Sequence, residues 1–305
     1  MNVLVTGANG FIGKSLCMSL SMRGDNVIKL VRNKIVKDES LQYECDFETK
    51  EFPEEALEGI DVIYHLAGIA HDITGSVFID NQYYLVNVDA TVKIATLAAK
   101  KNIKHFIFVS SAKAGGDPSG GVCSTEENLN IPKDIYAVTK REAEKKIIAI
   151  GKEFDLNVTI MRPSLVYGPN AGGNLKSMLL GIKKGWFPPI PKIDNRRSMV
   201  HIDDLVGSMI FVTNNKDAFG EIFIVTDGIP HSTRELYEEM CKLLGKDIPK
   251  WTMPIFLFNL LSKISKKLEK KVSKLLGDEC YSSDKLESIG FKPQRKLSEI
   301  NETYI

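Results

Sequence analysis

The chain has 305 residues with 40 basic and 39 acidic side chains, and 43% of its residues are hydrophobic. This is the composition of a globular protein with enough apolar residues for a core, and it excludes a disordered or fibrous chain. The near-zero net charge provides no general attraction to nucleic acid, so no nucleic-acid partner is expected.

The five cysteines are widely spaced, and no two of them form a CxxC pair. This pattern predicts neither a disulfide framework nor a zinc site, so no metal is expected. The first residues have the pattern of a strand and not of a signal peptide, and no apolar run is long enough to span a membrane. These features favour a protein of the reducing cytoplasm.

Short segments rich in valine, isoleucine and phenylalanine alternate with helical patterns through the first two thirds of the chain. The expected strands are Val3–Thr6, Val27–Val31, Val62–Leu66, Phe106–Ser110 and Val158–Met161. Helices are expected near 12–23, 81–101 and 134–152. Because the strands are apolar at consecutive positions and alternate with helices, the sequence predicts an α/β fold with a Rossmann-type, doubly wound parallel sheet.

After about residue 168 the sequence becomes richer in glycine and proline around one short helix. The later expected elements are helices near 203–214, 232–245 and 254–276 and a strand at Glu221–Thr226. The sequence thus predicts a dinucleotide-binding domain over 1–168, rejoined by about 200–228. A smaller C-terminal substrate-binding lobe is expected over 169–305.

The last of these helices, over 254–276, combines apolar residues at spacings of three and four with six lysines. The favoured interpretation is a helix that packs over the substrate pocket and leaves its lysines in solvent. The alternative is peripheral association with a surface of anionic lipid. On the favoured interpretation no membrane contact is expected.

Gly7, Gly10 and Gly13 join the first strand to the helix that follows. Glycines at these positions allow a tight turn and let a pyrophosphate approach the free N–H groups at the helix N-terminus. The turn therefore predicts a dinucleotide site. Its predicted contacts are Gly7, Asn9, Gly10, Phe11, Ile12 and Gly13.

The end of the second strand bears on which dinucleotide binds. An acidic residue there usually binds the ribose of NAD, but this chain has Arg32 and no acid. A guanidinium suits a 2′-phosphate, so NADP(H) is predicted, with NAD(H) as the alternative.

Tyr136 and Lys140 lie four residues apart, on one face of an expected helix. A nearby ammonium would favour the phenolate and lower the pKa of the tyrosine from about 10 toward neutrality. The strand that ends at Ser110 reaches the sheet edge where such folds bind ligands, so Ser111 would hydrogen-bond the same substrate oxygen as Tyr136. Ser111, Tyr136 and Lys140 are therefore the predicted catalytic residues.

Ordered motifs extend the pattern along nearly the whole chain. They include TGANGFIG at 6–13, HLAG at 65–68, Ser110-Ser111, YxxxK at 136–140, Arg162-Pro163, VYGP at 166–169 and RSMVHIDD at 197–204. Together they resemble the extended short-chain dehydrogenase/reductase family, in its nucleotide-sugar epimerase and reductase branch. This resemblance implies an NAD(P)-dependent enzyme that acts on a UDP-linked sugar, and a possible homodimer formed through the helices near 81–101 and 134–152.

The resemblance also implies roles for individual residues. The implied cofactor contacts beyond the glycine turn and Arg32 are Asp46, Phe47, Leu66, Ala67, Gly68, Asn87, Ser110, Tyr136, Lys140, Arg162 and Pro163. The implied substrate contacts are Ser111, Lys113, Tyr136, Asn174 and Arg197. The guanidinium of Arg197 has a geometry that suits a diphosphate.

Three activities of this branch compete. Dehydration is disfavoured because the acid and base that water elimination needs do not follow Ser111, where the sequence is Ala-Lys-Ala-Gly-Gly. Arg32 and this serine loop favour NADPH-dependent reduction of the C4 keto group of a UDP-4-keto-6-deoxy-N-acetylhexosamine, for surface polysaccharide. The alternative is an NAD-dependent 4-epimerase of UDP-hexose or UDP-N-acetylglucosamine. The complete catalytic set argues against a non-enzymatic dinucleotide-binding protein.

Overall fold

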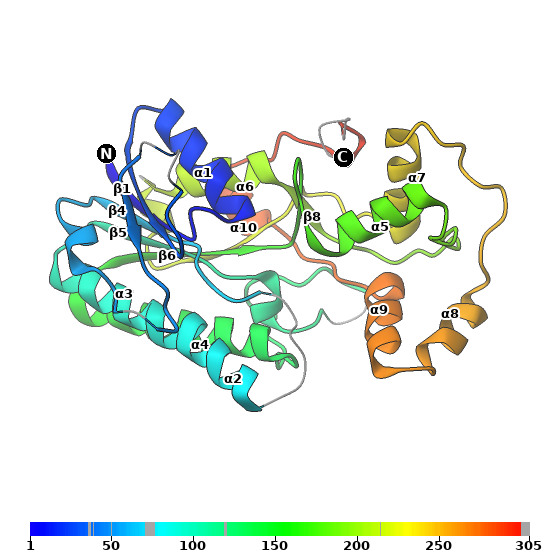
Figure 1. Cartoon of the computed structure of the whole chain (residues 1–305), viewed down its shortest axis with the longest axis horizontal. Helices are drawn as coiled ribbons and strands as arrows, with labels where there is room; N and C mark the ends of the chain where they lie inside the picture. The colour runs from blue at the N-terminus through cyan, green and yellow to red at the C-terminus, as the bar shows by residue number, and fades with distance from the viewer. Residues whose placement is uncertain are drawn as a thin grey trace.

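The structure, a computed structural model, describes residues 1–299 except 36–37, 39, 50, 71–76, 119–120 and 214. Its centre is a parallel sheet with the strand order β3-β2-β1-β4-β5-β6-β9 (Figure 1). The strands are β1 (Asn2–Thr6), β2 (Asn26–Val31), β3 (Gln42–Glu44), β4 (Val62–His65), β5 (His105–Val109), β6 (Asn157–Pro163) and β9 (Ile222–Val225). The predicted α/β class with a doubly wound parallel sheet is confirmed.

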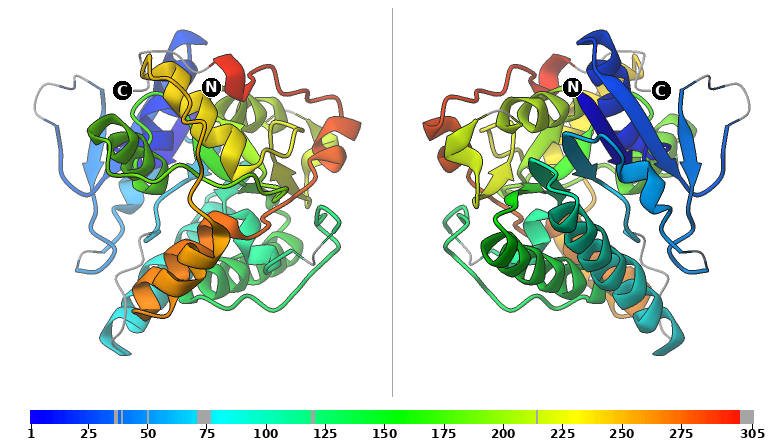
Figure 2. Two further views of the ribbon diagram at one scale, coloured as in Figure 1. Left: turned by 90° about the vertical axis from the view of Figure 1, so that its right-hand side faces the viewer. Right: turned by 90° about the vertical axis from the view of Figure 1, so that its left-hand side faces the viewer.

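Helices cover both faces of this sheet, as Figure 2 shows from its two sides. α1 (Phe11–Met22) and α6 (Ile202–Val212) pack together on one face, and α3 (Ala90–Lys100) and α4 (Ile135–Phe154) on the other. α2 (Val77–Tyr84) continues through a π-helical turn (Leu85–Asp89) into α3. Coverage on both faces explains why the strands are apolar at consecutive positions.

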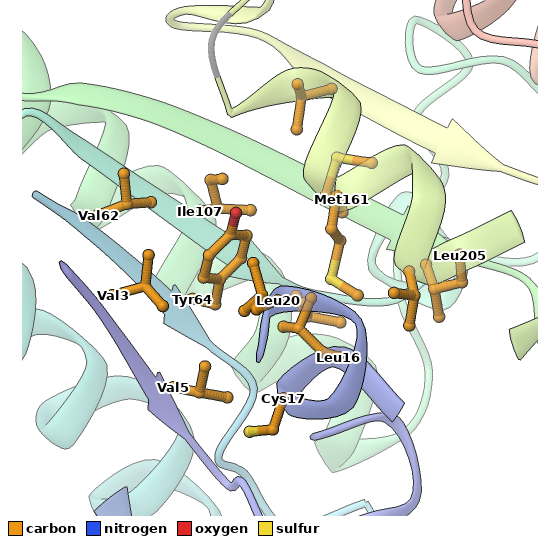
Figure 3. Packing of buried hydrophobic residues seen from close by; sticks show 14 of the residues in the cluster. Val3, Val5, Leu16, Cys17, Leu20, Val62, Tyr64, Ile107, Met161 and Leu205 are labelled. Atoms are coloured by element: carbon orange, nitrogen blue, oxygen red, sulfur yellow. The ribbon is translucent and has the colours of Figure 1, made fainter. Parts of the chain in front are cut away.

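The core on the α1 face fills the space between helix and sheet. Leu16 and Leu20 of α1 point toward Val3, Tyr64 and Met161 on three strands (Figure 3). The opposite core contains apolar residues of α3 and α4. Because β1, β2, β4, β5 and β6 carry side chains into both cores, the carboxyl ends of these strands are held firmly in position.

The sheet order reverses next to β1. The chain goes from β1 outward to β2 and β3, and then returns to β4 on the other side of β1. In such sheets ligands bind in the crevice beyond the carboxyl ends of the strands, at this reversal. The glycine turn after β1, the loop after β4 and Ser110-Ser111 after β5 all lie at this edge.

A second group of elements lies beyond the end of the sheet (Figure 1). It contains α5 (Gly173–Lys184), α7 (Thr233–Leu243), α8 (Ile255–Ser262), α9 (Lys266–Leu276) and the small parallel pair β7 (Leu165–Tyr167) and β8 (Met199–His201). These elements enclose a separate apolar core that includes Leu179, Leu236, Met240 and Phe258. After it the chain returns to the sheet, where Leu286 of α10 (Asp284–Ser288) joins the core on the α1 face.

The structure differs from two sequence predictions about elements. The single helix expected over 254–276 is two helices, because Ser265 breaks it and its Oγ caps α9 by accepting from the Leu268 N–H at 3.2 Å. The strands β3, β7 and β8 were not expected, since each is only three residues long.

No disulfide was expected from the cysteine spacing, but Cys123 and Cys280 form one. The bond joins the loop before α4 to the segment that follows α9. Backbone hydrogen bonds of 2.9 Å from the Ser124 N–H to the Cys280 oxygen and from the Ser282 N–H to the Ser124 oxygen hold the two segments together. Since 157 residues separate the two cysteines, no local spacing could indicate this pair.

Candidate active site

The glycine turn after β1 has a geometry that larger residues cannot adopt. Gly7 has a φ of +67°, in the left-handed region. A Cβ atom at Gly13 would collide with the Gly7 carbonyl oxygen, so α1 can approach the turn only because residue 13 is glycine. Gly10 precedes α1, and no side chain caps this helix end. The first N–H groups of α1 are therefore available to an anion such as a pyrophosphate.

A buried hydrogen-bond network fixes the loop after β4 beside this turn. Thr6 Oγ1 accepts from the N–H groups of Leu66 and Ala67, both at 3.1 Å, and lies 2.7 Å from His65 Nδ1. His65 Nε2 contacts Thr91 Oγ1 at 2.9 Å. Burial, together with the charge of Lys140, lowers the pKa of His65 to about 3, so its ring is neutral. His65 thus positions the loop and holds no charge.

Asn87, in the π-helical turn, ties this loop to α4. Its Nδ2 donates to the Ile69 oxygen at 3.1 Å and to Thr139 Oγ1 at 3.2 Å, while its Oδ1 accepts from the Ile69 N–H at 2.8 Å. A Cβ atom at Gly68 would lie 3.0 Å from Asn87 Oδ1 and 3.3 Å from Lys140 Nζ. The predicted cofactor residues Gly68 and Asn87 are therefore next to the predicted catalytic lysine.

Ser111 and Tyr136 meet at the edge of the sheet. α4 begins just before Tyr136, where Asp134 accepts from the Ala137 N–H at 2.8 Å. Tyr136 hydrogen-bonds the Ser111 side chain, whose Oγ also accepts from the Lys113 N–H at 3.3 Å. Two hydroxyl groups from separate elements are thus paired where a substrate oxygen could lie between them.

The predicted lowering of the Tyr136 pKa is wrong for this structure. Burial raises the pKa of the phenol to about 12, and the hydrogen bond from Ser111 opposes this only in part. Lys140 Nζ donates instead to the Val109 oxygen at 2.9 Å and lies 4.5 Å from the centre of the Phe108 ring. The sequence could not indicate this hydrogen-bond partner of the ammonium.

Lys140 is 4% exposed, and burial lowers the pKa of its ammonium to about 8. Glu144, one helical turn further on, opposes this shift. The Glu144 carboxylate is itself bound by Arg162, at 2.9 and 2.6 Å, in an ion pair whose two side chains are both 2% exposed. Two nitrogens of Arg162, an expected cofactor residue, thus bind Glu144 behind the lysine, and Pro163 ends the strand beside it.

Three further predicted cofactor residues, Arg32, Asp46 and Phe47, follow the strands β2 and β3. Arg32 is 62% exposed, and its guanidinium lies 4.0 Å from both Asp46 Oδ1 and Glu48 Oε1. The ring of Phe47 lies edge-on to His65. Glu48 is an acid that reaches the end of β2 from the neighbouring β3 side, so the sequence of β2 alone gives no sign of it.

Asn9 Nδ2 donates to the Asn33 oxygen at 3.2 Å, which connects the glycine turn to the end of β2. Phe11 and Ile12, at the start of α1, pack against the core. These three residues support the turn, and Asn9 also borders a cavity of about 290 Å³ between α1 and β2. That cavity is separate from Ser111 and Tyr136.

The predicted substrate residues come from distant segments. Lys113 Nζ lies 3.6 Å from Glu279 Oε1, and Arg197 Nη2 lies 2.9 Å from Glu279 Oε2. Arg197 also donates to the Lys274 oxygen at the end of α9. Asn174 lies exposed in the first turn of α5. Sequence analysis missed Glu279, because an isolated acid in a C-terminal loop carries no sequence signal.

The residues fit a bound dinucleotide. Ser110 Oγ, at the end of β5, is buried without a hydrogen-bond partner in the described part of the chain, so a polar group could pair with it. A Cβ atom at Gly7, Gly13 or Gly68 would press on neighbouring protein atoms, so these glycines let the turn, α1 and the loop after β4 approach one another closely. Among the described residues, no group of three or more His, Cys, Asp or Glu side chains could hold a metal.

Comparisons with known proteins agree with this geometry. The model of the NAD dependent epimerase/dehydratase family matches residues 3–225. A UDP-glucose 4-epimerase of Vibrio cholerae is 33% identical over 98% of this chain and 92% of its own. An N-acetyl-α-D-glucosaminyl-diphospho-ditrans,octacis-undecaprenol 4-epimerase of Escherichia coli O157:H7 is 25% identical over the same shares.

Solved structures show the same fold. A UDP-glucuronic acid 4-epimerase from Bacillus cereus, in complex with UDP-glucuronic acid and NAD, superposes with a TM-score of 0.80. The match covers 100% of this chain and 98% of that one at 22% identity. From the family match over most of its length, this chain is an enzyme that belongs to the NAD dependent epimerase/dehydratase family.

Proposed function

We propose that this enzyme is an NAD-dependent 4-epimerase of a UDP-linked hexose or N-acetylhexosamine. The 33% identity with a UDP-glucose 4-epimerase over nearly the whole chain carries this proposal. It is supported by the pairing of Ser111 and Tyr136 beside Gly68 and Lys140. The comparisons favour this function over the reductase hypothesis.

The cofactor residues would hold NAD with its pyrophosphate at the start of α1 and its ribose near Asn87 and Lys140. When bound, the oxidised nicotinamide accepts and returns a hydride and adds a positive charge to the site. That charge would favour the phenolate of Tyr136, against the burial that raises its pKa here.

Tyr136 would act at the C4 hydroxyl of the sugar. Its Oη takes the hydroxyl proton while hydride leaves C4, and gives the proton back when hydride returns to the opposite face. Ser111 would hold the same oxygen by a hydrogen bond and keep it within reach of Tyr136. Lys140 would bind the cofactor ribose and supply positive charge near the phenol.

Inversion at C4 requires the sugar ring to turn over while the nucleotide stays bound. Arg197 and Lys113 would bind the diphosphate, since both cations meet at Glu279 and Lys113 is only two residues from Ser111. Because these side chains are half-buried, the charged diphosphate could stay bound to them while the uncharged sugar ring turns.

A second candidate is the NADPH-dependent reduction of a UDP-4-keto-6-deoxy-N-acetylhexosamine. Exposed Arg32 at the end of β2 favours it, because a guanidinium there could bind a 2′-phosphate. Asp46 and Glu48 oppose it, since both carboxylates would repel that phosphate. Titration of the protein with NADH and NADPH compares the two cofactors directly, and Arg32→Ala should weaken NADPH more than NADH.

The deciding experiment supplies UDP-glucose, UDP-N-acetylglucosamine or a polyprenyl-diphosphate-linked N-acetylglucosamine with a catalytic amount of NAD. The proposed function predicts that a C4 epimer accumulates to equilibrium without net formation of NADH, as followed by NMR of the sugar. Consumption of NADPH by the 4-keto sugar, with no epimer from any of the three substrates, would replace the epimerase by the reductase.

A further inference from the structure

α8 presents an apolar stripe to solvent. Phe256, Leu260 and Ile264 are 67%, 60% and 67% exposed, and their spacing of four places them along one side of the helix and its end. Trp251, just before α8, is 63% exposed, while Phe258 is the one residue of α8 that is fully buried. Single exposed apolar residues are ordinary, but a contiguous group of this size marks an interaction site.

The same segment concentrates positive charge. Residues 250–276 contain seven lysines and one acid, Glu269. The remaining sequence contains 33 basic and 38 acidic residues, so the rest of the molecule is net negative. The structure describes five of these lysine side chains, and all five are exposed, namely Lys250, Lys263, Lys266, Lys271 and Lys274.

The two helices form one projecting unit. α8 and α9 pack against each other and lie at the outer edge of the molecule (Figures 1 and 2). Val272, Leu275 and Leu276 of α9 pack against the core of the C-terminal elements. α9 therefore uses its apolar side to attach the unit to the protein, and the stripe on α8 is left facing outward. The exposure of this stripe favours the alternative interpretation of the sequence, which is peripheral association with a surface of anionic lipid.

We propose that the α8–α9 unit docks on the surface of an anionic lipid bilayer. Phe256, Leu260 and Ile264 enter the boundary between head groups and acyl chains, and Lys263, Lys266 and Lys271 contact anionic head groups. No helix in the described part of the chain has the length and apolarity that crossing the bilayer would require, so the contact is peripheral.

The combination of groups distinguishes this partner from others. A nucleic acid would attract the lysines but would gain nothing from the apolar stripe. A second copy of the chain, docked symmetrically, would bring two sets of seven lysines together, and like charges in one interface repel. An anionic bilayer would bind the apolar stripe at its acyl-chain boundary and the lysines at its head groups.

The docked unit would lie directly behind the sugar side of the site. The carbonyl oxygens at the end of α9 accept hydrogen bonds from Arg197, from Asn195 Nδ2 and from Thr233 Oγ1. The bilayer contact is therefore linked to the proposed diphosphate site through a few hydrogen bonds. Docking itself does not depend on the reaction, so its test needs no substrate.

The test is flotation of the full chain with vesicles of phosphatidylcholine alone or mixed with phosphatidylglycerol. The protein should float with the mixed vesicles at low salt and much less at high salt, and should not float with phosphatidylcholine alone. Phe256→Ser combined with Leu260→Ser and Ile264→Ser should lower the bound fraction about tenfold or more. Lys263→Glu combined with Lys266→Glu and Lys271→Glu should lower it on the order of a hundredfold.

Matched control variants test whether binding depends on where the substituted residues lie or only on how many apolar or basic residues are lost. Met18→Ser with Met22→Ser and Ile131→Ser removes three other exposed apolar residues and should float like the wild type. Lys100→Glu with Lys101→Glu and Lys145→Glu reverses three lysines elsewhere and should keep most of the binding. Equal loss in the controls and in the α8–α9 variants would contradict a localised docking site.

The fluorescence of Trp251 can report docking without any substitution in α8 or α9. Trp186→Phe leaves Trp251 as the one tryptophan, and brominated acyl chains in anionic vesicles should quench its fluorescence. No quenching and no flotation at low salt would overturn the proposal. A dimer in solution that the α8 variant abolishes, without any vesicle binding by the wild type, would assign the stripe to a second copy instead.

Discussion

The proposed cofactor side of the site, at the glycine turn and the loop after β4, and its proposed sugar side, around Glu279, are held together by different interactions. On the cofactor side, buried neutral groups such as Thr6, His65 and Asn87 connect the loops through short hydrogen bonds. On the sugar side, Lys113 and Arg197 are held by one half-buried carboxylate, Glu279. The first arrangement is independent of salt, whereas the second weakens as salt screens its charges.

This difference matches what the proposed epimerase function would require of each side. A bound dinucleotide must present its ring at one fixed distance from the substrate, which a network of buried hydrogen bonds secures in advance. A sugar whose ring turns over needs a site that can rearrange. Ion pairs near the surface are worth little individually and can be exchanged for a ligand's charges.

The largest expected effect is at the contact between the two sides. Tyr136→Phe removes the group that carries the proton and should lower turnover by about 10²- to 10⁴-fold, while binding of NAD is retained. The measurement is the rate of C4 epimerisation alongside a NAD titration. Tyr84→Phe, at an exposed position on α2, is the matched control and should keep wild-type turnover. Normal turnover of Tyr136→Phe would remove the assigned proton transfer.

Acid should weaken the cofactor side through His65. Its pKa is about 3 in the folded protein against 6.5 for the unfolded reference, so between these values the unfolded state binds a proton that the folded state does not. The free energy of unfolding is therefore unaffected by His65 above about pH 6.5 and falls as the pH falls toward about 3.

His65→Asn removes this proton uptake. Relative to the variant, the wild type should lose about 3 kcal/mol of stability between about pH 7 and about pH 4, measured by denaturant unfolding at each pH. Stability curves that stay parallel over this range would show that His65 is not held neutral.

The sugar side should respond to the loss of a cation. Arg197→Met should weaken binding of UDP by about 30-fold, the effect of losing about 2 kcal/mol of charge-assisted hydrogen bonding. Binding of NAD should not change. Isothermal titration gives both affinities, and Arg196→Met is the neighbouring control with a smaller expected effect. Equal weakening by both variants would indicate general attraction in place of a specific contact.

The smallest expected effect is a gain, not a loss, in affinity for UDP. Glu279→Gln releases Lys113 and Arg197 from their shared carboxylate and should strengthen UDP binding by about two- to fivefold at low salt. Raising the salt concentration should reduce the difference between variant and wild type. Weaker binding of UDP by Glu279→Gln would mean that the carboxylate positions the cations and does not compete for them.

The sequence allowed prediction of the sheet and of the glycine turn because both depend on neighbours along the chain. Consecutive apolar residues identify strands covered on both faces, and the close approach of Gly13 to Gly7 is a property of one short turn. The spacing of Tyr136 and Lys140 likewise follows from one helix. The direction of the Tyr136 pKa shift did not follow, since it depends on burial by separate elements.

The contacts around the proposed substrate residues could not be predicted, because they join segments that are distant in the sequence. Glu279 reaches Lys113 and Arg197 through contacts between segments far apart in sequence. The Cys123–Cys280 bond and the approach of Glu48 to Arg32 also arise from tertiary packing. The break at Ser265 had a local signal, a capping serine, but the apolar spacing continued across it.

Glu279 lies next to a disulfide that joins two distant segments of the chain. Glu279 directly precedes Cys280, whose sulfur is bonded to Cys123 in the loop that leads to Tyr136. If the proposed diphosphate displaced Glu279 from Arg197, the segment that moved would be one that the Cys123–Cys280 bond joins covalently to the loop before α4. The position of Tyr136 would then depend on a cross-link as well as on the sheet.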